Sequence, residues 1–220
     1  MRSTILTITL VATLALSGCY LSEDASDVNQ ERIKTTYSTV FNATRDYTES
    51  LISFKFGHTP LQLSNPIYFR DMRLFETDDL LLGLHYSRDV DGIRNGIYEW
   101  TDEEGEIYRN TVKVFGFDLI NEPTEFEKYR YYNLAWEGDV IPNQSGKFHI
   151  KIKSHVDGTS CSFHTGERLE LASDHLLYLP AGPARMIISR KYSEQIDEGT
   201  QAGGKSTVSF VREYEITIVE

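Results

Sequence analysis

From about residue 61 onward, the chain consists of short runs of β-branched and aromatic residues separated by turn residues. Among these runs are GIYEW and EIYRN, which flank a turn at TDEEG, and later KFHIKIKSH, ARMIISRKY and STVSFVREYEITI. Residues of these types favour strands. Parallel sheets would need crossover helices, and the intervals between the runs offer few of them. The pattern therefore predicts a mostly β fold, an antiparallel β-sandwich over residues 57–220.

In the segment before these runs, apolar side chains recur with a different spacing. Residues 32–56 place apolar or weakly polar side chains at steps of three and four, which is typical of one face of an α-helix. Asp27 can cap its start, and Gly57 followed by Pro60 can end it. The residues on this face are Ile33, Tyr37, Val40, Phe41, Thr44, Thr48, Leu51 and Ile52. We therefore expect one N-terminal amphipathic helix at 32–56, packed on the sandwich.

The first residues predict export. Arg2 is followed by an apolar run over residues 5–15, which is shorter than the roughly 20 residues that span a bilayer. The run ends in Leu16-Ser17-Gly18-Cys19, which resembles the lipobox of bacterial lipoproteins. The resemblance implies that residues 1–18 are a signal peptide and that Cys19 is lipidated, which would anchor the protein in an envelope membrane. Tyr20 resembles the outer-membrane default of such proteins. The alternative is an ordinary signal peptide with a chance cysteine.

Charge and cysteine content limit the partners. Residues 19–31 are acidic and poor in apolar side chains, so we expect a flexible tether there. Cleavage removes one of the 22 basic residues, Arg2, and leaves 21 against 33 acidic residues, a formal charge of −12. Such a chain is repelled by nucleic acid phosphates and by anionic headgroups, so we expect no nucleic-acid partner. Only Cys161 remains beside Cys19, and no intramolecular disulfide is available.

The segment GTQAGGKS at residues 199–206 fits the phosphate-binding pattern G-x-x-x-x-G-K-[ST]. That loop works only between a buried strand and a helix, because the helix N-terminus holds the phosphates. Here the following residues alternate apolar and polar side chains, which is typical of a strand. We therefore expect a hairpin loop that binds no nucleotide.

Other reactive side chains do not form a catalytic or metal-binding pattern. His149, Lys151, Lys153 and His155 share one face of a predicted strand, and the two histidines stand roughly 20 Å apart, too far to share a metal. That face is expected to meet solvent. Cys161 is expected to be a small buried thiol. We expect no cofactor, no metal and no catalytic residue, and hence no enzyme.

Residues 136–214 carry an ordered set of landmarks. They are Trp136-Glu137-Gly138, Pro142, Ser145-Gly146-Lys147-Phe148, Ser154 to Gly158, Leu179-Pro180-Ala181-Gly182, Tyr192 and the glycine-rich loop. This order resembles the protective-antigen-type β-sandwich domain of toxins, glycosidases and adhesins. In sugar-binding members, two adjacent Asp residues joined by a cis peptide hold calcium and the ligand hydroxyls. The matching positions here are Val156-Asp157, so one carboxylate is missing.

The resemblance implies a ligand site around Asp157, Gly158, Trp136 and Tyr131, where aromatic rings could stack on a sugar. The alternatives are that Asp157 only shapes its turn and that the tyrosines pack within the sheets. The expected function is a membrane-anchored, non-catalytic module for a glycan or a partner protein. Two alternatives are a structural or assembly accessory of an envelope complex and a polysaccharide hydrolase.

Overall fold

The computed structural model describes residues 22–79, 82–92, 94–142 and 146–220. The expected signal peptide and Cys19 lie outside this part of the chain. The described residues are mostly strand, as predicted. Two short 3-10 turns are η1 (Ala25–Asp27) and η2 (Gln30–Arg32). In the described residues no helix is long or apolar enough to cross a bilayer.

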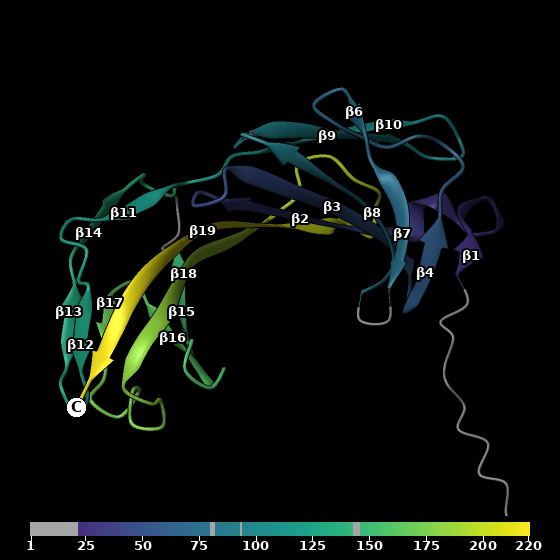
Figure 1. Ribbon diagram of the computed structural model, residues 1–220. Helices are drawn as coiled ribbons and strands as arrows, with labels where there is room; N and C mark the ends of the chain where they lie inside the picture. The colour runs from purple at the N-terminus through teal and green to yellow at the C-terminus, as the bar shows by residue number, and fades with distance from the viewer. Residues whose placement is uncertain (1–21, 80–81, 93, 143–145) are drawn as a thin grey trace, which may run out of the picture.

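One large sheet forms the body of the molecule and curves like an arch (Figure 1). Its path runs β1-β4-β3-β2-β19-β18-β15-β16, with β7, β8 and β12 added at its margins. Its strands are β1 (Glu23–Asp24), β2 (Ile33–Asn42), β3 (Tyr47–Phe56), β4 (Thr59–Gln62), β7 (Phe75–Asp79), β8 (Gly83–Asp91), β12 (Glu125–Glu127), β15 (Lys147–Ser154), β16 (Ser160–Gly166), β18 (Gly182–Gln195) and β19 (Gly204–Val219).

Most pairs in this sheet are antiparallel, but three are parallel: β1 with β4, β12 with β19, and β19 with β2. The last pair joins the N-terminal hairpin β2–β3 to the long C-terminal hairpin β18–β19. The two halves of the chain therefore share one sheet.

The helix expected at residues 32–56 is wrong, because this segment is the antiparallel hairpin β2–β3. Asn42 makes the turn: its side-chain oxygen accepts hydrogen bonds from the backbone N–H of Thr44 and Arg45 at 3.1 and 3.0 Å. Buried side chains alternate along both strands, and several are polar, such as Thr35 and Thr48. Because some buried residues are polar, the sequence does not show the alternation of apolar and polar side chains that is typical of a strand. The many β-branched and aromatic residues of the segment favour the strand.

The flexible tether expected at residues 19–31 is wrong for its described part, since residues 23–31 form a strand and two 3-10 turns. Glu23 and Asp24 pair with Leu61 and Gln62 of β4. Ala25 is fully buried, and the Gln30 side chain donates to the Ala25 carbonyl at 2.6 Å. Residues 23–31 are therefore part of the fold.

The loop GTQAGGKS joins the antiparallel strands β18 and β19, as predicted, and β19 is a strand where a phosphate-binding loop would need a helix. The hydroxyl of Thr200 anchors the loop by donating to the Ile33 carbonyl at 2.6 Å. Gly203 has a φ of 66°, which favours glycine.

Smaller sheets cover the buried face of the large sheet. One is the four-stranded sheet β10-β9-β5-β6, which lies over β2 and β3 in Figure 1. The other two are the pairs β11–β14 and β13–β17. Their strands are β5 (Tyr68–Phe69), β6 (Met72–Arg73), β9 (Gly96–Thr101), β10 (Ile107–Val112), β11 (Phe117–Leu119), β13 (Tyr132–Leu134), β14 (Trp136–Gly138) and β17 (Leu169–Leu171).

Aromatic and polar contacts hold the four-stranded sheet to the large one. Trp100 packs edge-on against Phe54, with ring centroids 4.8 Å apart, and its indole N–H donates to the Tyr37 hydroxyl at 2.9 Å. The Asn110 amide donates to the same hydroxyl at 3.0 Å. All of these side chains are buried. Because buried polar groups are costly when unpaired, these bonds fix how the layers sit on each other.

Candidate functional site

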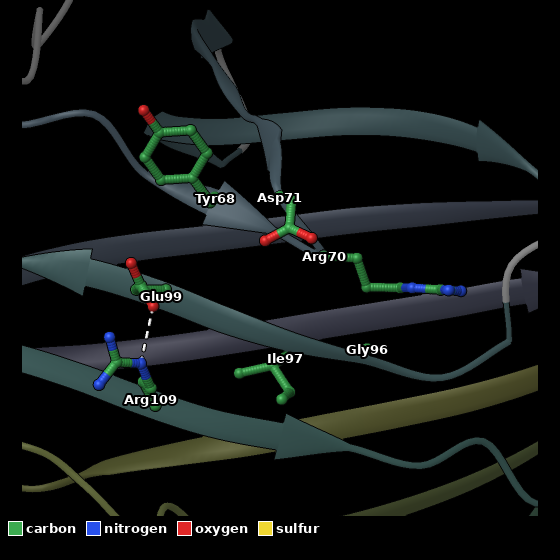
Figure 2. Close-up of a pocket in the computed structure, with 7 residues that line it drawn as sticks. All are labelled: Tyr68, Arg70, Asp71, Gly96, Ile97, Glu99 and Arg109. Atoms are coloured by element: carbon green, nitrogen blue, oxygen red, sulfur yellow. Dashed lines mark hydrogen bonds and ion pairs between the residues drawn. The ribbon is translucent and has the colours of Figure 1, made fainter.

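The four-stranded sheet turns its outer face to solvent, and a groove of about 620 Å³ lies there (Figure 2). Tyr98 and Trp100 of β9 point inward and are fully buried, so Ile97 and Glu99 point outward. Strand register brings the lining together, because Glu99 lies opposite both Tyr68 of β5 and Arg109 of β10. The groove is lined by Tyr68, Arg70, Asp71, Gly96, Ile97, Glu99 and Arg109.

A strained turn forms one wall of this groove. Phe69 pairs with Met72, so Arg70 and Asp71 are the two loop residues of a tight hairpin. Their φ angles are 49° and 62°. Two-residue hairpin loops with positive φ at both positions strongly favour Asn-Gly or Asp-Gly, because other side chains are strained there. Such strain is concentrated at functional sites in proteins, so this turn is a candidate for one.

Gly96 allows the turn to close over β9. A Cβ atom at Gly96 would lie 2.3 Å from ring carbons of the buried Phe69 and 2.7 Å from Arg70 Cγ. The backbone N–H of Arg70 donates to the Ile97 carbonyl at 3.0 Å. The glycine therefore sets the depth of the groove at this end.

Polar groups of both charges face the groove. Arg109 Nε lies 2.7 Å from Glu99 Oε2, and the Arg109 backbone N–H donates to Glu198 Oε2 at 2.5 Å. The side chains of Arg70 and Asp71 are exposed and have no hydrogen-bond or ion-pair partner within the described ranges. Figure 2 shows the Tyr68 ring, the Asp71 carboxylate and the Glu99–Arg109 pair on the same side of the sheet.

Tyr68 supplies an unused aromatic surface. The side chain is half-buried, and within the described residues it forms no ring contact and no hydrogen bond. Tyrosine presents an apolar ring and a polar hydroxyl, so it can cover the apolar face of a ligand and also bond its edge. Carboxylates and guanidinium groups beside such a ring can accept from and donate to hydroxyl groups. The groove thus offers an open platform for a polyhydroxylated ligand.

The residues expected from the sequence to bind a ligand lie elsewhere. Asp157 and Gly158 occupy the turn between β15 and β16, where the Asp157 carboxylate accepts from the Thr159 N–H at 2.9 Å and from its hydroxyl at 2.7 Å. These bonds hold the pKa of Asp157 below its usual value. Gly158 has a φ of 78°. Both residues shape the turn, and no group of three or more metal-binding side chains occurs in the described part of the chain.

Trp136 and Tyr131 have different surroundings. Trp136 packs against Phe148 with ring centroids 4.9 Å apart, and the Arg190 guanidinium lies 4.8 Å from its ring centre. It is therefore part of the packing between β14 and the large sheet. Tyr131 is 54% exposed and directly precedes β13. Among the described residues, no hydrogen bond, ion pair or ring contact joins Trp136, Tyr131 and Asp157 to one another.

The sequence predicts the β9–β10 hairpin but not the groove on it. The alternation of exposed Ile97 and Glu99 with inward Tyr98 and Trp100 was visible in GIYEW, and it could have identified an outer face. Compared with known proteins, this chain matches no protein-family model and no curated protein. The geometry of the groove itself is therefore the basis for assigning a function.

Proposed function

We propose that the protein is a lipid-anchored envelope protein and a non-catalytic module that binds a glycan in the groove of β5, β6, β9 and β10. The observation that carries this proposal is the free Tyr68 ring beside two carboxylates and two guanidinium groups on one open surface. Sugars have apolar ring faces and hydroxyl edges, and this combination suits both. The strained turn at Arg70 and Asp71 supports a functional role for the same surface.

The proposed anchor would hold the fold close to the membrane. If Cys19 carries the lipid, four chain steps separate it from Glu23, where β1 begins. Four fully extended residues span at most about 14 Å. The β1–β4 edge would then lie near the lipid headgroups. We assign the outer membrane because Tyr20, which follows Cys19, resembles the outer-membrane default of bacterial lipoproteins.

We also infer a β-sandwich related to the protective-antigen type for the C-terminal half. Phe117 of β11 packs edge-on against Phe148 of β15 and Phe210 of β19, with ring centroids 5.1 and 5.3 Å apart. Trp136, the first landmark of the resemblance, packs in the same layer. The strand pair β11–β14 thus packs on the large sheet, and this supports a sandwich of two layers.

A glycan microarray tests the binding function. The wild-type protein should bind a defined set of glycans, and Tyr68→Ala should lose them because the stacking surface is removed. Tyr178→Ala is the matched control, because Tyr178 is 88% exposed and does not line the groove. Retained binding in Tyr68→Ala, or equal loss in both variants, contradicts the assignment.

Two other outcomes would favour different functions. Co-purification of an envelope protein without any glycan binding favours a structural accessory. Release of shorter products from a bound polysaccharide favours a hydrolase. The anchor is tested separately by fatty-acid labelling in cells: the wild-type protein should take up the label and Cys19→Ser should not.

A further inference from the structure

A second cavity lies on the opposite, open face of the large sheet, away from the covering layers. Its volume is about 350 Å³. It is lined by Lys147, His149, His164, Lys191, Tyr192, Ser193 and Lys205, which come from β15, β16, β18 and β19. None of these residues is acidic, although the whole chain has a formal charge of −11. The cavity is therefore a local concentration of basic groups on an acidic protein.

Strand register forces these basic groups against each other. Lys147 of β15 lies directly opposite Lys191 of β18. His149 lies opposite His164 of β16, and their ring centroids are 4.7 Å apart. Like charges directly opposite each other in a sheet destabilise it. The opposed Lys147 and Lys191 therefore destabilise the sheet unless an anion neutralises them.

The three lysines of the cavity also lack ion-pair partners among the described residues. Within the described ranges, no ion pair involves Lys147, Lys191 or Lys205. By contrast, Arg185 on the same open face of β18 pairs with Glu213 and Glu215 at 3.3 and 2.8 Å. The ammonium groups around the cavity remain available to a ligand.

The residue types select the kind of anion. Arginine binds carboxylates and phosphates alike through two parallel bonds, whereas lysine presents a compact point charge that responds mainly to the charge of its partner. The cavity contains three lysines and two histidines and no arginine. Beside them, the hydroxyls of Ser193 and Thr207 lie 3.0 Å apart and can donate to or accept from a bound group. Because a phosphate dianion carries about twice the charge of a carboxylate and offers more acceptor oxygens, three unpaired ammonium groups beside these hydroxyls suit it better than a carboxylate.

We propose that the cavity formed by Lys147, His149, His164, Lys191 and Lys205 binds a phosphate group. The phosphate is carried by a soluble sugar phosphate or by a phospholipid headgroup, and the chemistry at the cavity is the same for both. This site is independent of the glycan groove. It gives Lys205, the lysine of the GTQAGGKS segment, a role outside any nucleotide-binding loop.

Calorimetric titration of the full chain at low salt tests the proposal, with inorganic phosphate, glucose 6-phosphate and glycerophosphoglycerol as separate probes. Phosphate should bind saturably, and higher salt should weaken binding because charges are screened. Tighter binding of glucose 6-phosphate identifies a sugar source, and tighter binding of glycerophosphoglycerol identifies a headgroup. No binding of any probe overturns the proposal.

Lys191→Gln and Lys153→Gln form a matched pair of variants. Lys191→Gln should weaken phosphate binding about tenfold or more, since a hydrogen bond from a charged group is lost. It should also raise the melting temperature of the ligand-free protein, because the repulsion with Lys147 disappears. Lys153→Gln removes the same charge from the same open face but does not line the cavity, so binding should be nearly unchanged. Equal weakening in both variants would show a diffuse charge effect and overturn the site.

Discussion

Relief of strain in the groove turn should stabilise the protein and weaken glycan binding together. The double variant Arg70→Asn/Asp71→Gly replaces two residues whose φ angles are 49° and 62°. The left-handed conformation costs roughly 1–2 kcal/mol for an ordinary residue such as Arg70 and less for Asp71, and asparagine and glycine reduce this cost. Glycine loses about 0.5–1 kcal/mol through the greater entropy of the unfolded chain. The net gain should be about 1 kcal/mol.

Urea unfolding measures this gain directly, and thermal melting should show a rise of about 2–4 °C for a chain of this size. Glycan affinity should fall about tenfold or more, because a carboxylate and a guanidinium group leave the groove. Asp46→Gly is the control: Asp46 has a φ of 51° in the β2–β3 turn, outside the groove, so its replacement should stabilise the fold and leave binding intact. A double variant that is no more stable, or that binds glycan normally, refutes the reasoning.

Three further predictions rest on local geometry. Gly96→Ala should destabilise the fold by about 1–3 kcal/mol in urea unfolding, since the new Cβ would overlap the buried Phe69 ring, and an unchanged midpoint would contradict the close approach of that ring to β9. The pKa of His149 is lowered by burial and by the nearby His164 on β16, Lys151 on the same strand and Lys191 on β18. The neutral form of His149 should therefore contribute stability above about pH 6.5, and this contribution should be lost as pH falls through the lower pKa of the folded state. His149→Gln should flatten this pH dependence in thermal melts, and an unaltered profile would assign it to other groups. Millimolar calcium should leave the melting temperature unchanged, because Thr159 already satisfies the Asp157 carboxylate; a rise of several degrees that is lost in Asp157→Ala would restore a calcium site there.

The sequence predicted strands where the solvent-facing and buried residues differ clearly in polarity. The β9–β10 hairpin, the β18–β19 hairpin and the exposed Lys151–Lys153 face of β15 are confirmed. The β2–β3 hairpin was missed because Thr35 and Thr48 face the core while Val40 and Leu51 lie on the open face. Because polar residues lie on the buried face and apolar residues on the open face, the alternation of polar and apolar side chains that marks a strand is lost. The remaining apolar residues happen to recur at helical spacing.

The groove could not be predicted because its parts are distant in the sequence. Tyr68 and Glu99 are neighbours only through the pairing of β5 with β9, and the strain at Arg70 and Asp71 is a property of the backbone. A sequence reveals neither register between distant strands nor a φ angle. The basic cavity was missed for the same reason, since Lys147 meets Lys191 only across the ladder of β15 and β18.

The most direct test of glycan binding in the groove is the affinity of the strongest microarray glycan for three proteins: wild type, Tyr68→Phe and Tyr68→Ala. Titration calorimetry should give Tyr68→Phe an affinity close to wild type, because the ring surface is kept, and Tyr68→Ala an affinity about tenfold or more lower. The glycan should be recovered intact after each titration. Equal affinity of wild type and Tyr68→Ala would contradict binding in this groove, and a cleaved glycan would contradict a non-catalytic module.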